Sequence, residues 1–307
     1  MDIGQPSLDQ LRIFLAVAEE GSFNRAARRL GRPLSVVSYA VAALEAQLNL
    51  RLFARQGSRR PELTEAGRAL LAEARSVTDE VAALLAKVRG LHQGLEAELA
   101  LAVDVMVPSD ALAQVLRDFQ RVFPSVTLRL HVEALGAVAA LVLDGHADLG
   151  IAGPVALDDS RLERQALAAV ELVPVAAPAH PLAKADVVAP GEARRHLQLV
   201  LTDRSPLTEG RDFSVVSPRS WRLADLGAKH MLLREGIGWG NMPRHMIAGD
   251  LAAGTLVVLA LPEGPGLDYA LSAVWRRDVR PGPAACWTLK AFDERLADCP
   301  ALAVPGR

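Results

Sequence analysis

Residues 21–45, GSFNRAARRLGRPLSVVSYAVAALE, have the pattern of two short helices joined by a tight turn. Ser22 can cap the first helix with its hydroxyl. The turn falls at Gly31-Arg32-Pro33, because proline fits the first position of a helix and disfavours helical geometry in the residue before it. Upstream, Ser7-Leu8-Asp9-Gln10 has the form of a capping box and predicts a further helix that ends at Gly21. We therefore expect a small three-helix unit in this region.

The last of these helices has two different faces. Its apolar residues recur at helical spacing and predict the buried face: Val37, Val41, Leu44 and Leu48. The opposite face carries Ser35, Val36 and Tyr39 and has no Lys or Arg. Hydroxyl groups can exchange hydrogen bonds with base edges in a major groove, and a valine can pack against a thymine methyl. We therefore expect this face to contact DNA bases.

The positive charge lies outside that helix. Residues 1–60 contain nine arginines and five acidic residues, a net charge of +4, whereas the whole chain has −2. Four of these arginines share one face of the preceding helix and its turn: Arg25, Arg28, Arg29 and Arg32. Residues 52–55 and 60–63 predict two short strands with Arg55, Arg59 and Arg60 at the tip between them. A basic hairpin beside a helix-turn-helix is a wing, suited to backbone or minor-groove contact.

The order of GSFNRAARRL, SVVSYAVAALEAQL, LFAR and LTEAG resembles the winged helix-turn-helix of LysR-type transcriptional regulators over about 60 residues without a gap. The resemblance implies promoter DNA as a partner. Where this family usually has Ser-Gln, the chain has Pro33-Leu34, so its base recognition is expected to be unusual. The DNA-binding residues that we expect are Arg25, Arg28, Arg29, Arg32, Pro33, Leu34, Ser35, Val36, Ser38, Tyr39, Arg55, Arg59 and Arg60.

A long helix is predicted from the cap at Thr64 to about Leu91. Its apolar residues alternate at spacings of four and three, as in a coiled coil. The helix could pack on its own chain, but a seam of three heptads between two domains favours a dimer, whose paired DNA-binding units could address half-sites about one DNA turn apart. The residues expected at the dimer seam are Leu70, Val77, Val81, Leu84 and Val88.

From residue 98 onward, strands and helices alternate. Strands at 98–105, 127–134 and 147–153 with helices at 109–122 and 136–144 predict a parallel sheet. A second α/β unit follows, and a strand at 267–277 with a helix at 283–297 returns to the first. Two lobes joined by crossovers near 160–164 and 264–268 would form a hinged clamp. This arrangement resembles the effector-binding domain of the LysR family, which is similar in turn to periplasmic solute-binding proteins.

The fold class expected is therefore α/β with an N-terminal winged helix-turn-helix, a long linker helix and a two-lobed effector-binding domain. The expected boundaries are 1–64 for the DNA-binding domain, 65–93 for the linker and 94–307 for the effector-binding domain. Within the last, lobe one comprises about 94–161 and 267–307, and lobe two about 162–266.

Ligands of such sheets bind beyond the carboxyl ends of the strands, next to helix N-termini. Ser109 could cap its helix and bind a ligand oxygen, and Arg204 could pair with a carboxylate. Trp221 and Trp239 could enclose an aromatic or apolar ligand. A plain cap, a surface arginine and a core tryptophan remain the alternatives. The effector-binding residues expected are Val107, Pro108, Ser109, Gly153, Pro154, Thr202, Asp203, Arg204, Ser205, Trp221, Gly238 and Trp239.

Catalytic and metal motifs are missing from the sequence. The seven histidines show no metal-ligand spacing, Cys286 and Cys299 form no disulfide framework, and neither a GxSxG elbow nor a P-loop is present. GIGWG lacks the glycine spacing of a dinucleotide fingerprint and is interpreted as a tight turn. We expect no metal, no cofactor and no enzymatic activity. An α/β enzyme remains an alternative, although the N-terminal unit would then have no role.

The N-terminal sequence lacks the basic start and apolar core of a signal peptide, and the apolar runs are too short to cross a bilayer. This argues against a secreted solute-binding protein, the third alternative. We expect a cytoplasmic dimer or tetramer without a membrane partner. Its partners would be promoter DNA, a second copy of itself, RNA polymerase and a small-molecule effector that is a carboxylate or an aromatic compound. The effector's identity, the operator sequence and the choice between activation and repression are not encoded in these patterns.

Overall fold

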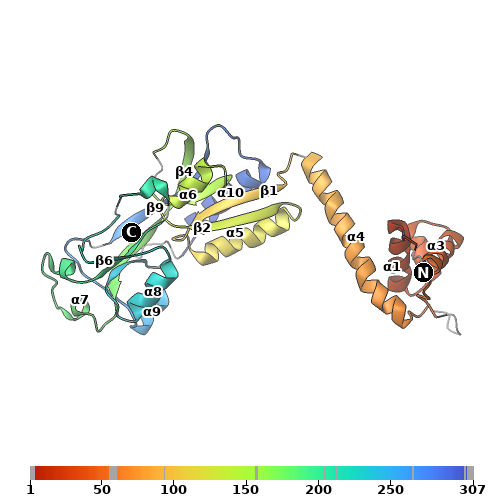
Figure 1. The fold of residues 1–307 in the computed structure, drawn as a ribbon, viewed down its shortest axis with the longest axis horizontal. Helices are drawn as coiled ribbons and strands as arrows, with labels where there is room; N and C mark the ends of the chain where they lie inside the picture. Colours follow the sequence, from red (N-terminus) through yellow and green to blue (C-terminus); the bar gives the residue numbers. More distant parts are fainter. Residues whose placement is uncertain are drawn as a thin grey trace. The chain divides into compact units, whose positions relative to one another are not determined.

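The computed structural model (Figure 1) describes residues 4–54, 61–92, 94–155, 158–203, 205–211, 213–264, 266–300 and 302. It divides into two compact units, Met1–Arg89 and Gly90–Arg307. The division falls within the segment predicted as a linker helix. The predicted fold class, a helix-turn-helix followed by an α/β unit, is confirmed.

The first unit contains α1 (Leu8–Glu20), α2 (Phe23–Leu30), α3 (Leu34–Leu48) and nearly all of α4 (Glu65–His92). The predicted capping box is present, since Ser7 Oγ accepts from Gln10 N at 3.2 Å and Gln10 Oε1 accepts from Ser7 N at 2.8 Å. Gly21 and Gly31 end α1 and α2 in the left-handed conformation, which a glycine adopts without steric cost. Local chemistry therefore sets the limits of these helices.

The core of the first unit is formed by the apolar faces of α1, α2 and α3 around Phe14 and Phe53. The rings of Phe14 and Phe53 meet edge to face with their centroids 5.7 Å apart, a favourable aromatic geometry. In the described part of the predicted wing, Phe53 and Leu63 form an antiparallel bridge, and Ala54 N donates to the carbonyl of Glu62 at 2.8 Å. Glu45 Oε1 accepts from Leu52 N and Phe53 N beside this bridge. The wing tip, with Arg55, Arg59 and Arg60, lies outside the described residues.

The long helix α4 begins as predicted, with Thr64 Oγ1 accepting from Gly67 N at 3.0 Å. Its first apolar residues do not form an open seam. Ala74 is buried, and Leu70 packs beside it against the core of the first unit. Leu70, which is predicted at the dimer seam, is therefore half-buried against the core of its own unit, and its place in a seam stays a prediction. Further along, Val77, Leu84 and Val88 are exposed.

The second unit is built on a seven-stranded sheet with the order β2-β1-β3-β9-β4-β7, and β8 pairs with β4. The predicted parallel start is confirmed: β1 (Glu98–Asp104), β2 (Thr127–Glu133) and β3 (Leu149–Ala152) are parallel. The helices between them are α5 (Ser109–Val122) and α6 (Ala137–Leu143). α5 lies along β1 and β2 (Figure 1), and α10 (Pro283–Ala297) packs against it. We call this part lobe one.

Two long antiparallel strands connect lobe one to the rest of the unit. β4 (Leu162–Ala176) and β9 (Leu267–Arg276) pair from Leu162↔Arg276 to Leu172↔Leu267, with an irregularity between Ala166 and Ala168. The two strands begin near 160–164 and 264–268, where the crossovers are predicted, and then pair along most of their length. Continuous pairing has a physical reason, because the backbone groups of a segment that crosses a buried region must be hydrogen-bonded.

Lobe two contains the remaining elements. Here β4 pairs with β7 (Gly240–Pro243) and β8 (Val257–Val258), while β5 (Gln198–Leu201) and β6 (Ser220–Leu223) form a parallel pair. The helices are α7 (Pro181–Lys184), α8 (Leu226–Arg234) and α9 (Ala248–Ala253), with 3-10 turns at Glu192–Arg195 and Pro206–Thr208. Within the described residues, no helix has both the length and the apolar character that crossing a membrane requires.

Candidate functional site

The first candidate site is the outward face of α3, defined as Leu34, Ser35, Val36, Ser38 and Tyr39. All five side chains are exposed, and Tyr39 has an exposed fraction of 76%. The predicted inner face is buried, since Val37, Val41 and Leu44 are at most 3% exposed. The division of α3 into two faces is therefore confirmed. The outward face presents apolar and hydroxyl groups to solvent without any charge.

The start of α3 lacks a capping side chain. Pro33 occupies the N-cap position with φ −59° and ψ 145°, and no side chain accepts a hydrogen bond there. Its carbonyl accepts from Val36 N and Val37 N at 3.1 and 3.3 Å. The first N–H groups of a helix carry partial positive charge and have no partner within the helix. An exposed phosphate oxygen can satisfy them.

Most of the arginines near α3 are paired with carboxylates of α1. Arg32 lies in the turn after α2, which ends at Leu30. The ion pairs are Arg25–Glu20 at 3.8 Å, Arg29–Glu19 at 2.8 Å, Arg29–Glu20 at 3.3 Å and Arg32–Asp9 at 2.6 Å. These groups are exposed, so each pair contributes little to stability and can exchange for a phosphate. Among the described residues, Arg28 is exposed and makes no ion pair.

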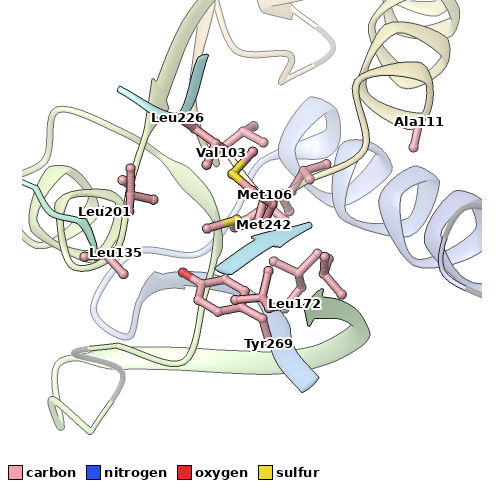
Figure 2. Packing of buried hydrophobic residues seen from close by; sticks show 14 of the residues in the cluster. Val103, Met106, Ala111, Leu135, Leu172, Leu201, Leu226, Met242 and Tyr269 are labelled. Carbon is pink, nitrogen blue, oxygen red and sulfur yellow. The ribbon is translucent and has the colours of Figure 1, made fainter. Parts of the chain in front are cut away.

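The second candidate site is a cavity of about 170 Å³ between the lobes, here called the inter-lobe cavity. It lies where the ends of β1 and β5 approach the two crossing strands. Its wall includes Met106, Leu135, Pro154, Phe213, Lys229 and Tyr269. Figure 2 shows Met106 and Tyr269 in the core beside it, with Leu172 of β4 next to the tyrosine ring. Most of this wall is apolar.

A buried carboxylate supports the floor of the cavity. Asp104, at the end of β1, is 1% exposed. Its Oδ2 accepts from Tyr269 Oη at 2.7 Å and its Oδ1 accepts from Met106 N at 2.9 Å. Burial raises the pKa of Asp104 to about 6, and the hydrogen bonds from Met106, Tyr269 and nearby backbone N–H groups limit the rise. This contact fixes the orientation of the Tyr269 ring, which lines the cavity.

A buried lysine lies in the wall of the same cavity. Lys229 of α8 is 3% exposed, and its Nζ donates to the carbonyl of Asn241 at 2.6 Å. Burial alone lowers the pKa of Lys229 to about 8. No carboxylate among the described residues is paired with it. An ammonium group in this position makes the cavity favourable for an anion.

Two residues of the cavity wall have an unusual backbone. Leu135 has φ 52° and Ser214 has φ 56°, in the left-handed region that costs a non-glycine residue about 1–2 kcal/mol. The other described non-glycine residue with positive φ is Asn49, at the end of α3. Such conformations cluster at binding sites, where the surrounding structure holds them. The positive φ angles of Leu135 and Ser214 therefore support the inter-lobe cavity as a candidate binding site.

Several predicted effector residues do lie between the lobes. Pro154 lines the inter-lobe cavity. Asp203 and Ser205 line a larger opening of about 630 Å³, which residues of lobe one also border. Thr202 lies on a neighbouring hollow together with these two residues. Arg204, predicted to pair with a carboxylate, lies outside the described residues.

Other predicted effector residues have different positions. Ser109 does not cap α5, because the N-cap position falls on Pro108 and no side chain caps the helix. Val107 and Pro108 are buried in lobe one, so their contribution is to packing. Gly153 is also buried, and a Cβ there would overlap the ring of Tyr269. Its role in the structure is to make room for that ring.

The two tryptophans do not enclose the inter-lobe cavity. Trp239 is 1% exposed in the core of lobe two, and its Nε1 donates to the carbonyl of Ala193 at 3.2 Å. Trp221 lies on β6 with an exposed fraction of 52% and is absent from the wall of that cavity. Gly238, with φ 72°, provides the turn before β7, where a Cβ would collide with the carbonyl of Leu197. Trp239 is therefore a core residue, which the sequence leaves open as the alternative to a ligand contact.

Sequence patterns missed Met106, Phe213, Lys229, Asn241 and Tyr269 in the cavity wall. For Lys229 a signal was present. It lies three residues after Leu226 and four before Leu233, and both leucines are buried. A lone lysine on the buried face of a helix needs a partner or a function.

Comparison with known proteins gives consistent matches. Residues 8–68 match the family described as "Bacterial regulatory helix-turn-helix protein, lysR family", and residues 92–297 match "LysR substrate binding domain". The chain is 30% identical over 283 residues to the HTH-type transcriptional regulator PunR of Escherichia coli (strain K12), covering 91% of this chain and 90% of PunR. It is 28% identical over 291 residues to the HTH-type transcriptional regulator AceR of Acinetobacter baumannii, covering 93% of this chain and 95% of AceR.

Solved structures show the same fold. Full-length LysG from Corynebacterium glutamicum with bound effector Arg has a TM-score of 0.52 at 22% identity, covering 95% of this chain and 98% of LysG. An H2O2-bound mutant of OxyR from Corynebacterium glutamicum has a TM-score of 0.52 at 22% identity, covering 95% and 96% of the two chains. At these identities the likeness concerns the fold alone.

Proposed function

Because this chain belongs to the LysR family of transcriptional regulators, we propose that the outward face of α3 recognises its promoter site and that a small molecule in the inter-lobe cavity modulates this binding. The chain is a DNA-binding regulator with an effector-binding domain, and its relatives are regulators rather than enzymes. The observation that carries the proposal is the exposed, uncharged face of α3 beside a cluster of arginines. We place its action in the cytoplasm, where promoter DNA is found.

The two kinds of DNA contact are divided between elements. Ser35, Val36 and Tyr39 would touch base edges, since their side chains are exposed on one face of α3. Arg28 would bind a phosphate directly, because it has no ion pair among the described residues. Arg25, Arg29 and Arg32 would exchange their exposed carboxylate partners for phosphates. Phosphate contacts position a protein on DNA, and base contacts specify the sequence. The predicted wing would add contacts with the DNA backbone through Arg55, Arg59 and Arg60.

Pro33 determines how the N-terminus of α3 would contact DNA. A serine at the cap would satisfy the first N–H groups of the helix with its own side chain, whereas Pro33 leaves them without a side-chain acceptor. We expect these groups to bind a DNA phosphate at the edge of the groove. Leu34 and Ser38 are exposed beside this point and would pack against the sugar-phosphate backbone.

The protein would act as a dimer or tetramer. Val77, Leu84 and Val88 expose apolar surface along α4, and Val81 is half-buried between them. Pairing of this segment with a second copy would remove it from water. A dimer presents two copies of α3, which fits a roughly two-fold symmetric promoter site. RNA polymerase is a further expected partner at such a site.

Control by an effector requires a difference in affinity. A ligand shifts the regulator between two states only if it binds one of them more tightly. The inter-lobe cavity meets this requirement, because its wall comes from both lobes and from β4 and β9, so a relative movement of the lobes would change it. LysG, whose structure contains its effector Arg, provides the precedent for a ligand in this fold.

The test of DNA binding is a salt series. Fluorescence anisotropy would measure the affinity of the full chain for the DNA upstream of its own gene and for an unrelated duplex of equal length. Release of counterions predicts that the logarithm of the binding constant falls linearly with the logarithm of the salt concentration. A flat salt response, or equal affinity for the two duplexes, would contradict the proposal.

A further inference from the structure

The inter-lobe cavity has one charged side chain in its described wall, that of Lys229. Its neighbours there are mainly aliphatic or aromatic, including Met106, Leu172 and Phe213. A wall of this kind suits an apolar body, and one ammonium group suits one anionic group on that body. The composition of the wall thus limits the chemistry of the ligand.

Lys229 has unused hydrogen-bonding capacity. An ammonium group has three donors, and one of them reaches the carbonyl of Asn241. The residue is 3% exposed, so water cannot fully satisfy the remaining donors. Burial lowers its pKa only to about 8, which leaves the group mostly protonated at pH 7. A buried cation without an anion is costly, and a bound carboxylate would remove this cost.

Two other polar side chains of the wall, those of Gln198 and Tyr269, are already engaged in hydrogen bonds. The side chain of Gln198 donates to the carbonyl of Ser214 at 2.8 Å and accepts from Val216 N and Ser217 N at 2.8 and 3.0 Å. Tyr269 donates its hydroxyl hydrogen to Asp104. These side chains shape the cavity, whereas Lys229 retains free donors for a ligand.

We propose that the inter-lobe cavity binds a small monocarboxylate with an apolar aliphatic or aromatic body, and that Lys229 pairs with its carboxylate group. This inference rests on the proposed function, in which the cavity is the effector site, and it names the chemical class of the effector. The competing explanation is structural: Lys229 would only tie α8 to β7 through the carbonyl of Asn241.

Matched pairs of ligands separate these explanations. Isothermal titration of the full chain at pH 7 would compare benzoate with benzamide, phenylacetate with phenylacetamide, and hexanoate with hexanamide. At least one carboxylate should bind at least tenfold more tightly than its amide, because hydrogen bonds to charged groups are stronger than those between neutral groups. Lys229→Met and Lys229→Gln should lose this preference. Lys184→Met, which removes an exposed lysine of lobe two, should retain it.

The wild-type protein supplies a second readout that needs no folded variant. Between pH 7 and 9.5 the preference for the carboxylate should decline, since Lys229 loses its proton near pH 8. Asp104 is already ionised above its pKa of about 6, and the raised pKa of Tyr269 keeps that group protonated across this range. Circular dichroism would establish that the variants are folded.

Three outcomes would overturn the proposal: equal binding of carboxylate and amide, a preference that survives in folded Lys229 variants, or no binding by any carboxylate of the series. DNA binding measured on the same preparations distinguishes this failure from a failure of the proposed function. A chain that binds its promoter but prefers no carboxylate rejects only the effector class. A wild-type chain that binds no promoter rejects the function itself.

Discussion

At the scale of single residues, two charged side chains of the described core, Asp104 and Lys229, differ in how fully they are hydrogen-bonded. Asp104 receives hydrogen bonds from Tyr269 and from the backbone of Met106. Lys229 has a single carbonyl partner, contributed by Asn241. The carboxylate is therefore held as a structural group, whereas the ammonium keeps free donors that favour an anion. Both shift in pKa because burial disfavours the charged form.

Tyr269→Phe should destabilise the protein more at pH 7.5 than at pH 4. The substitution removes one donor to the buried Asp104 carboxylate, which costs about 1–3 kcal/mol when the group is ionised. The folded pKa of Asp104, about 6, lies above its unfolded value near 3.8. Wild-type stability therefore declines as pH rises through this interval, and the variant should decline more steeply. Urea unfolding at both pH values measures the difference, and Tyr39→Phe, at an exposed site, is the control.

Lys229→Met should stabilise the protein at pH 7. The folded pKa of about 8 lies below the unfolded value of 10.5, so burial of the charged form costs about 3 kcal/mol, partly offset by the bond to Asn241. This cost is complete below pH 8 and disappears as pH rises through 10.5. The gain measured by urea unfolding should thus be larger at pH 7 than at pH 10. A loss of stability at pH 7 would show that the hydrogen bond from Lys229 to the carbonyl of Asn241 stabilises the fold by more than burial of the charge costs.

At the scale of elements, α3 and α4 each separate a buried from an exposed set of residues. On α3 the exposed set faces solvent along the whole helix, beginning at Pro33, which leaves the helix start uncapped. On α4 the division falls along the length: Ala74 is buried by α1–α3, whereas Leu84 is exposed. Helical periodicity cannot distinguish these cases, because it describes which residues share a face but not how far a neighbour covers it.

Substitutions on α2 and α3 should affect DNA binding in different ways. Tyr39→Ala should reduce the preference for promoter over unrelated DNA by about 1–3 kcal/mol, because it removes a base contact. Arg28→Ala should weaken binding to both duplexes alike, because it removes a phosphate contact. The slope of the logarithm of the binding constant against the logarithm of the salt concentration should become shallower by about one. Anisotropy titrations with the two duplexes measure both effects. If both variants lost affinity for the two duplexes equally, the assignment of Tyr39 to base contact and of Arg28 to phosphate contact would be contradicted.

Leu84→Ser should convert the protein to monomers while leaving the folded unit intact. Leu84 has an exposed fraction of 59%, so a polar residue removes apolar contact with a second copy without opening a cavity in its own chain. Multi-angle light scattering measures the mass. Ala82→Ser, also exposed and off the predicted seam, is the matched control. An unchanged mass in Leu84→Ser would reject α4 as the dimer element.

At the scale of the whole molecule, the chain has two compact units with different cores. The first core is drawn from residues 11–74 around Phe14, and the largest core of the second contains Tyr269 and the other groups below the inter-lobe cavity. A regulator of this type must bind DNA with one unit and its effector with the other. Separate cores allow each unit to remain folded while the other responds.

Phe14→Ala should therefore destabilise only the first unit. Phe14 is fully buried, and its truncation should cost about 3–5 kcal/mol. We expect promoter affinity to fall and the first unit's calorimetric transition to move to lower temperature. The transition of the second unit should stay within about 0.5 kcal/mol of its original stability. Equal shifts in both transitions would show that the units fold as one.

The helix-turn-helix, the limits of its helices and the parallel start of the α/β unit could all be predicted from the order of residues alone. Caps such as Ser7 and Gly31 act on their own turn, and the spacing of Val37, Val41 and Leu44 reports a face of a single helix. These signals are local, so the order of residues along the chain contains them. They extend to the family resemblance, which depends on the same short segments.

The side chains that form the inter-lobe cavity, in contrast, are known only from the three-dimensional fold. Met106, Lys229 and Tyr269 come from three distant elements, and no local pattern brings them together. The same limitation applies to Trp239, for which the sequence leaves both a ligand site and the core open, and which lies in the core of lobe two. Burial and pairing depend on neighbours remote in sequence. That is why the outward face of α3 was predictable from the sequence, whereas the position of Lys229 in the cavity wall was not.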